Sequence, residues 1–250
     1  WHPDGRRIAW IAWNHPNMPW DGSWLRTGRL ALSETGLPSL YEMTTVAGDE
    51  RTSIFQPQFS PDGRWLAYVS DKSGWWQIYV YDLESGEHRQ LTQLLAEHGE
   101  PAWVQGVRTF TFSNDGKRLF FLRNQLGSVT LWQLEVATGA EQQIPLAGYT
   151  SLLQPATSPD GKRLALLASA GNVPPRVITC NLSGEVHVWR RGMAEELPAA
   201  AYAIPQHITW PGMDGGTVYG LFYPPQNDAF AVANLPPLVV MVHGGPTSQR

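Results

Sequence analysis

The sequence predicts a mainly β protein made of repeated four-stranded units, and three observations support this fold class. One four-residue turn recurs along the chain, a short apolar segment follows each copy, and a second turn with a polar segment comes later in each repeat. Of the 250 residues, 42% are hydrophobic. This fraction is enough to bury a sizeable core.

The recurring turn organises the first two hundred residues. Its copies are His2-Pro3-Asp4-Gly5, Ser60-Pro61-Asp62-Gly63, Ser113-Asn114-Asp115-Gly116 and Ser158-Pro159-Asp160-Gly161, with aspartates 58, 53 and 45 residues apart. Pro or Asn suits the second turn position, Asp accepts local backbone hydrogen bonds, and Gly can take positive φ. Each copy should therefore join two antiparallel strands.

The segments that follow these turns are apolar and rich in β-forming residues. They occupy residues 7–13, 64–69, 117–122 and 162–167. They are too short and too continuously apolar for amphipathic helices, so buried inner strands are expected.

Two further strands complete each repeat. After the turn at 60–63 and the apolar segment come an alternating segment at 77–83, a turn at 84–87 and a polar strand at 88–92, and the same order returns at 129–144 and 177–189. Four short strands at a period of about 40 to 50 residues are typical of β-propeller blades. A β-sandwich also has many short strands, but it would not repeat one turn with the same flanking strands.

We therefore expect a partial ring of about four propeller repeats over residues 1–203. The first repeat should lack its outer part, so that the chain starts inside a blade, and closure of the ring is left open. Open blade edges would need the missing part of the protein or another chain to cover them.

Residues 204–250 change in character. Residues 207–210 and 217–223 flank a Gly-rich turn and predict a hairpin, and a connector at 224–237 leads into the apolar run Leu238 to Val242. Such a run is typical of a strand buried in a mostly parallel sheet. His243-Gly244-Gly245-Pro246 follows it directly.

A buried strand that runs into His-Gly-Gly is similar to the corner of α/β-hydrolases whose backbone amides help to form an oxyanion hole. Glycine suits this place because a Cβ would block the approach of a substrate carbonyl oxygen. The other interpretation is an ordinary turn at the end of a strand. On the first interpretation, residues 204–250 are the first strands of an α/β-hydrolase domain.

The order of propeller, hairpin, connector and Val-His-Gly-Gly-Pro resembles the prolyl oligopeptidase class (family S9) of serine peptidases, in particular its acylaminoacyl-peptidase and dipeptidyl-peptidase-like members. The stretches that carry the resemblance are residues 13–22, 59–65 and 235–248. It implies a Ser-Asp-His triad that hydrolyses short peptides by acyl transfer, with the propeller gating access of an oligopeptide substrate.

The same resemblance implies roles for residues at the C-terminal end. Gly244 and Gly245 match the oxyanion-hole loop, the amide of Gly245 is the preferred donor, and His243 shapes the loop. The triad of the family lies downstream of this loop, the sequence contains no Gly-x-Ser-x-Gly, and Ser248 lacks the elbow of a nucleophile. The chain is therefore expected to be an internal piece of the peptidase, inactive alone.

Composition excludes several other classes. The net charge of −4 is spread along the chain, which argues against nucleic acid or an anionic membrane as a partner, and no apolar run is long enough to cross a membrane. Cys180 is the single cysteine, so neither a disulfide framework nor a cysteine-rich zinc site can form, and a cytoplasmic location is expected. The seven histidines are widely separated, so neither a metal nor another cofactor is expected.

Three other segments allow two interpretations each. Glu97-His98-Gly99-Glu100 either binds a peptide amine or is a polar loop between blades. Residues 14–21 either project towards the partner domain or substrate chamber or pack on their own blade. Trp75-Trp76 either stacks on a ligand or packs between blades. For the whole chain, the alternative function is a non-catalytic propeller that binds another molecule, with an esterase of the same hydrolase fold as a third possibility.

Overall fold

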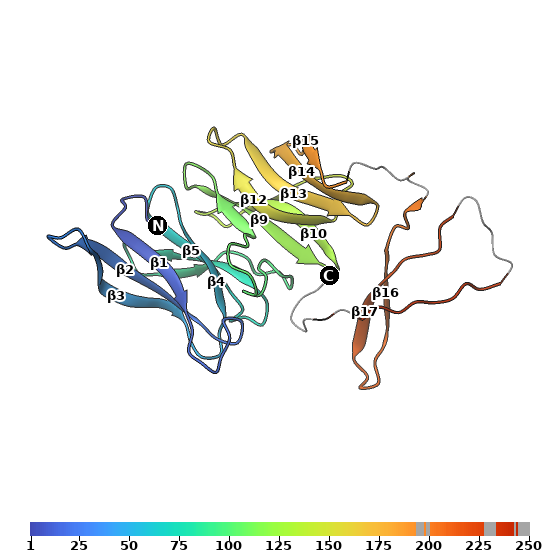
Figure 1. The fold of residues 1–250 in the computed structure, drawn as a ribbon, viewed down its shortest axis with the longest axis horizontal. Coiled ribbons are helices and arrows are strands. Elements are labelled where there is room, and N and C mark those ends of the chain that lie inside the picture. Colours follow the sequence, from blue (N-terminus) through green and yellow to red (C-terminus); the bar gives the residue numbers. More distant parts are fainter. Residues whose placement is uncertain (194–197, 199–200, 228–233, 243, 245–250) are drawn as a thin grey trace.

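Four antiparallel sheets follow one another along the chain and form the blades in Figure 1. The computed structural model describes residues 1–193, 198, 201–227, 234–242 and 244. The first sheet contains β1 (Arg7–Ala12), β2 (Trp24–Leu32) and β3 (Pro38–Gly48). The second contains β4 (Ile54–Phe59), β5 (Trp65–Ser70), β6 (Gln77–Asp82) and β7 (His88–Gln90).

The third and fourth sheets repeat the arrangement of the second. The third contains β8 (Phe110–Phe112), β9 (Arg118–Gln125), β10 (Ser128–Glu135) and β11 (Glu141–Ile144). The fourth contains β12 (Ser151–Thr157), β13 (Arg163–Ala170), β14 (Val173–Asn181) and β15 (Val186–Arg191). Within each sheet, strands that follow one another in the chain are hydrogen-bonded neighbours. The prediction of propeller blades with four short strands is confirmed.

The first sheet has three strands, and the missing strand is not the one that we predicted. The turn at 2–5 precedes β1, just as the turn at 60–63 precedes β5. β2 and β3 correspond to the third and fourth strands of a blade, so the outer strands are present. The prediction that this repeat lacks its outer part is wrong. In the other blades the first strand comes before the recurring turn, and it is the counterpart of this first strand that the first sheet lacks.

The recurring turns are built as their residue types predict. Ser60 Oγ donates to Asp62 Oδ1 (2.5 Å), the backbone N–H of Trp65 donates to Ser60 Oγ (2.9 Å), and Gly63 has a φ of +76°. The same two hydrogen bonds recur in the turns at 113–116 and 158–161. Neighbouring turns also touch, since His2 Nε2 lies 2.9 Å from the carbonyl oxygen of Gly63.

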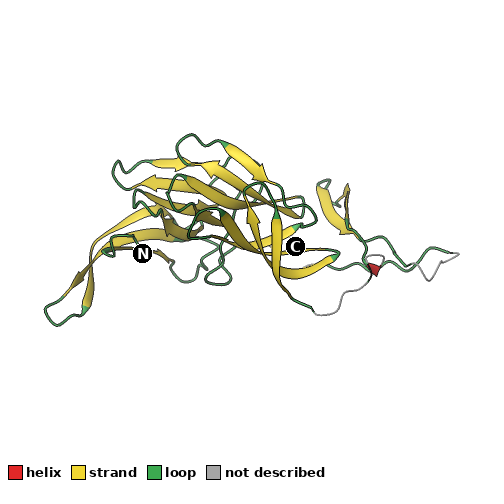
Figure 2. Ribbon diagram, turned by 90° about the horizontal axis from the view of Figure 1, so that it is seen from above, coloured by secondary structure: helices red, strands yellow, loops and turns green. Residues whose placement is uncertain are grey.

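The hydrophobic core lies between adjacent sheets, in three clusters. Leu66 and Phe120 are fully buried in two of them. The strands after the turns are buried almost throughout in β5 and β9, as predicted, but β13 alternates and β1 is only half-buried. The difference follows from position, because the described residues cover the first and fourth sheets on one face only. Figure 2 shows the stacked sheets, with the long hairpin of β2 and β3 projecting beyond them.

The C-terminal segment contains a separate two-stranded sheet. β16 (Gln206–Pro211) and β17 (Thr217–Phe222) form the predicted hairpin. Leu238 to Val242 differ from the prediction, since they form no strand and are 74 to 90% exposed. A strand of this composition is stable when neighbouring strands pair with it and side chains cover both faces. The described residues supply neither.

Candidate functional site

One face of the propeller carries the loops that follow β1, β5, β9 and β13, and we call it the loop face. The recurring turns lie at the opposite ends of these strands, because each turn directly precedes one of them. A Cβ added to Gly171, in the turn after β13, would lie 3.0 Å from Pro205 Cδ and 3.7 Å from the ring of Tyr223. The C-terminal segment therefore touches the propeller on the loop face.

A cavity of about 390 Å³ opens on the loop face, between the first two sheets and the loop at 102–108. Its first wall comes from the end of β1 and the loop after it, and its second wall from β4. The lining residues used below are Trp10, Trp13, Pro19, Phe55, Gln56 and Arg108. We call this the loop-face cavity. Its volume lies in the range of small-molecule sites in proteins.

The loop after β1 forms part of the first wall. The Oγ of Ser53 donates to the carbonyl oxygen of Pro19 (2.6 Å), and the side-chain amide of Asn17 donates to the carbonyl oxygen of Glu50 (3.0 Å). A Cβ on Gly22 would lie 2.2 Å from that Glu50 oxygen, so the close approach requires glycine. Residues 14–21 thus pack against the connection to the second sheet, as one interpretation expects, and Pro19 among them also lines the cavity. Their projection towards a partner domain or substrate chamber stays a prediction.

The loop at 102–108 forms the third wall of the cavity, and two glutamine side chains fix its position. Gln56, at φ +48°, accepts from the backbone N–H of Thr109 (2.6 Å) and donates to the carbonyl oxygen of Phe110 (2.7 Å). Gln154, at φ +57°, accepts from the backbone N–H of Arg108 (3.1 Å) and donates to the carbonyl oxygen of Gly106 (3.3 Å). The segment 106–110 is therefore held from both sides by side chains of β4 and β12.

Sequence reasoning missed these glutamines, although a signal was present. Gln56-Pro57 and Gln154-Pro155 each begin four residues before the serine of a recurring turn. Both glutamines lie at β-bulges, where the register of the strand shifts. A bulge re-aims a side chain, and here it points an amide at the neighbouring sheet.

Arg108 provides the one charged side chain among the lining residues. It is exposed, and among the described residues no carboxylate forms an ion pair with its guanidinium. Other arginines of the propeller do have acidic partners, for example Arg64 with Asp82 (3.0 Å) and Arg123 with Glu141 (2.5 Å). The cavity therefore combines aromatic and proline walls with an unpaired cation.

Of the two predicted oxyanion-hole residues, the structure describes Gly244. Gly244 is exposed, and a Cβ added to it would meet no atom within 4 Å. His243 and Gly245 lie outside the described residues. The assignment of Gly244 and Gly245 to an oxyanion hole thus stays a prediction.

The segment Glu97 to Glu100 is part of the packing between the second and third sheets. His98 is 1% exposed, and its Nε2 accepts from Nε of Arg123 (2.9 Å) while its Nδ1 lies 3.2 Å from the carbonyl oxygen of Trp76. Burial lowers the pKa of His98 to about 4 and raises the pKa of Glu97, whose Oε2 accepts from the backbone N–H of Trp76 (2.8 Å). The structure favours the polar-loop interpretation, and buried Trp76 likewise belongs to the core.

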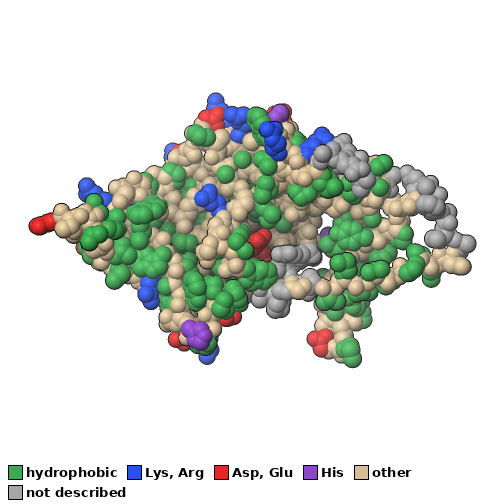
Figure 3. Space-filling view, viewed as in Figure 1, with side chains coloured by type: hydrophobic (Ala, Val, Ile, Leu, Met, Phe, Trp, Pro, Cys, Tyr) green, Lys and Arg blue, Asp and Glu red, His purple; other side chains and the backbone are tan. Residues whose placement is uncertain are grey.

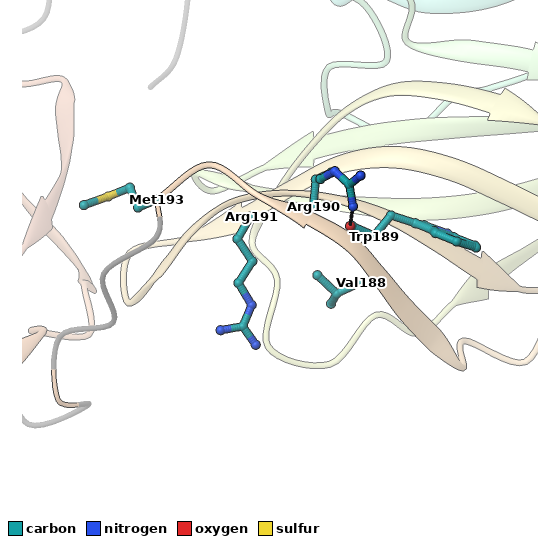
Figure 4. A pocket seen from close by; sticks show the side chains of 5 residues that line it. All are labelled: Val188, Trp189, Arg190, Arg191 and Met193. Carbon is teal, nitrogen blue, oxygen red and sulfur yellow. Dashed lines mark hydrogen bonds between the residues drawn. The ribbon is translucent and has the colours of Figure 1, made fainter.

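A second hollow, of about 430 Å³, borders β15 (Figure 4). Its side chains come from β15 and from Met193 just after it, and they point in different directions. The guanidinium of Arg190 donates to the carbonyl oxygen of the adjacent Trp189 (3.0 Å). No group of side chains converges there, so the loop-face cavity is the better candidate site.

Neither a metal centre nor a membrane span is found in the described part of the chain. No three His, Cys, Asp or Glu side chains gather there as a metal site would require. No helix long and apolar enough to cross a membrane occurs among the same residues.

Comparisons with known proteins point to propeller-containing peptidases. The family model of the TolB β-propeller domain matches residues 1–203. The uncharacterized peptidase YuxL of Bacillus subtilis is 33% identical over 102 residues, which is 40% of this chain and 14% of that protein. Dipeptidyl-peptidase 5 of Porphyromonas gingivalis is 24% identical over 154 residues, or 58% of this chain and 20% of that protein.

A solved structure matches nearly the whole chain. The crystal structure of a puromycin hydrolase superposes with a TM-score of 0.85 and 29% identity, over 98% of this chain and 36% of that one. The chain therefore spans about a third of this hydrolase and a smaller share of the two peptidases named above. The resemblance to the prolyl oligopeptidase class of serine peptidases is confirmed by these relatives.

Proposed function

The chain belongs to the TolB β-propeller domain family, and from this premise we propose that it is the propeller part, with the first hydrolase strands, of a serine peptidase that cleaves short peptides. The reaction is acyl transfer by a Ser-Asp-His triad, and the propeller gates access of the substrate. Within the class, we expect the protein to act like an acylaminoacyl-peptidase or a dipeptidyl-peptidase.

One observation carries this proposal over a free-standing propeller. The TolB propeller model ends at residue 203, which is about 81% of the 250 residues (203/250), whereas the puromycin hydrolase superposes on 98% of the chain. The match therefore includes most of residues 204–250. A propeller that only binds another molecule has no need of this segment.

The C-terminal segment also has the surface of an incomplete domain. Ile208, Trp210 and Tyr219 of the hairpin are 41 to 66% exposed, and Figure 3 shows hydrophobic side chains gathered there. Exposed apolar patches of this kind mark sites of contact with other protein surface. In this proposal the remaining hydrolase domain covers them, and it or another chain also covers the open blade edges.

The division of labour follows from the same proposal. Gly244 and Gly245 belong to the oxyanion-hole loop, and the triad residues lie outside residues 1–250. This chain alone is then inactive. The boundary between propeller and hydrolase near residue 203 and the cytoplasmic location stay predictions.

The alternative function is a non-catalytic propeller that binds another molecule. It draws support from the family model, which covers the propeller without the C-terminal segment. In that case residues 204–250 would have no catalytic role.

Hydrolysis of chromogenic substrates separates the two proposals. The complete protein and the 250-residue chain are each incubated with aminoacyl and N-acetyl-aminoacyl nitroanilides. We expect release of nitroaniline by the complete protein and none by the chain alone. Absence of hydrolysis by the complete, folded protein with every such substrate would favour the binding module.

A further inference from the structure

We propose that the loop-face cavity is a subsite for peptides that end in a free carboxylate, which Arg108 binds while the aromatic walls hold the last apolar side chain. The inference deepens the proposed function and rests on it for the identity of the ligand as a peptide. It assigns a preference for the acidic end of the substrate to residues of the propeller.

The lining of the loop-face cavity is largely aromatic and apolar. Trp10, Trp13 and Phe55 supply aromatic surface, and Pro19 adds a rigid apolar edge. Trp13 is 43% exposed, so a ligand can cover it and gain burial without displacing protein atoms. Such walls suit an aromatic or large aliphatic side chain.

The charge of the lining favours an anionic ligand. The lining contains Arg108 and no aspartate or glutamate, so it would attract an anion and repel an amine. The guanidinium forms no ion pair with a carboxylate of the described residues, so none of those carboxylates competes with a ligand. A planar guanidinium can donate two parallel hydrogen bonds to one carboxylate.

The backbone that carries Arg108 is held in place by hydrogen bonds. The backbone N–H of Arg108 is bonded to Gln154, and the next residue, Thr109, is bonded to Gln56. The base of the arginine is thus fixed by two sheets before any ligand arrives. Ligand binding then orders mainly the side chain of Arg108, so the entropic cost of binding is low.

The loop-face cavity and the C-terminal segment lie on the same face of the propeller. The cavity opens on the face where Pro205 and Tyr223 approach Gly171, so it lies on the side of the propeller that the C-terminal segment touches. A peptide held there by its carboxylate end would have its remaining residues free to extend along that face.

Calorimetric titration of the 250-residue chain tests the inference without any catalysis. The two ligands are N-acetyl-alanyl-phenylalanine and the same dipeptide with a C-terminal amide. We expect the free acid to bind about fivefold more tightly than the amide, as an accessible charged pair of about 1 kcal/mol would give. Arg108→Gln should remove this preference, while the affinity for the amide should stay within about twofold.

Arg163→Gln is the matched control, because it removes one exposed arginine near the recurring turn at 158–161, on the opposite face. It should keep the preference for the acid. Equal binding of acid and amide, no binding of either ligand, or equal loss in both variants would overturn the inference. Each of these results leaves the peptidase proposal intact, since that is judged by hydrolysis in the complete protein.

Discussion

Two apolar segments of similar composition have opposite environments in this molecule. Leu66 to Val69 in β5 are all buried, because β4 and β6 pair with the strand and the neighbouring sheets cover it. Leu238 to Val242 have the same β-forming character, yet they form no strand and are exposed. The contrast shows that composition alone settles neither the strand nor its burial, because both depend on neighbouring strands and covering side chains, which the described residues supply in the propeller.

The largest expected effect is on the buried member of this pair. Leu66→Ala should lower the free energy of unfolding by about 3 kcal/mol, because it leaves a cavity in a closely packed core. Leu238→Ala is the matched substitution at a leucine that is 75% exposed, and it should change stability by less than about 0.5 kcal/mol. Urea unfolding of both variants measures the difference. Similar losses in the two variants would mean that residues 238–242 are packed after all.

A second test concerns the hydrogen bond between His98 and Arg123, which lies between the second and third sheets. His98 has a pKa of about 4 in the folded chain against 6.5 as its ordinary value, so the unfolded chain binds a proton more readily. Its contribution to stability is fully present above pH 6.5 and is lost as the pH falls towards 4, by about 3 kcal/mol in all. Glu97, whose pKa is raised by burial, opposes this change near its own titration.

The variant His98→Gln isolates the histidine, because a glutamine can still accept from Arg123 but does not titrate. Urea unfolding between pH 7 and pH 4 should give a flatter pH dependence for this variant than for the original chain. Parallel curves would contradict the assigned role of His98.

The third test compares Gln56 in β4 of the second sheet with Gln142 in β11 of the third sheet. Gln56→Ala should cost about 2 kcal/mol, because it leaves the buried N–H of Thr109 without its partner. Gln142→Ala removes an exposed side-chain hydrogen bond with Gln133 (2.7 Å) and should cost less than about 0.5 kcal/mol. Chemical unfolding followed by tryptophan fluorescence measures both. Equal effects would contradict the role of Gln56 as a link between sheets.

The smallest expected effect lies in the recurring turns. Hydrogen bonds from Ser113 and from the backbone N–H of Lys117 lower the pKa of Asp115 from its ordinary value of 3.8. The carboxylate therefore stabilises the turn at pH values above 3.8. This contribution is lost as the pH falls below that value. Asp115→Asn should therefore reduce the loss of stability between pH 5 and about pH 3, measured by thermal unfolding, relative to the original chain. If Asp115→Asn loses as much stability between pH 5 and about pH 3 as the original chain, the proposed stabilisation of the turn by this carboxylate is wrong.

Much of the propeller could be predicted because its signals are local. The turn residues and the apolar segments after them fixed β5, β9 and β13 to within three residues, since each strand starts directly after a turn. The candidate site was not predicted. Trp13, Gln56 and Arg108 are far apart in the sequence, and packing of three segments brings them together.

The most direct test of the central proposal is labelling of the complete protein with a fluorophosphonate, followed by mass spectrometry of the labelled peptide. The proposal predicts one labelled serine outside residues 1–250 and no label on the 250-residue chain alone. A complete, folded protein that takes no label, or a label on a serine within residues 1–250, would contradict the proposal.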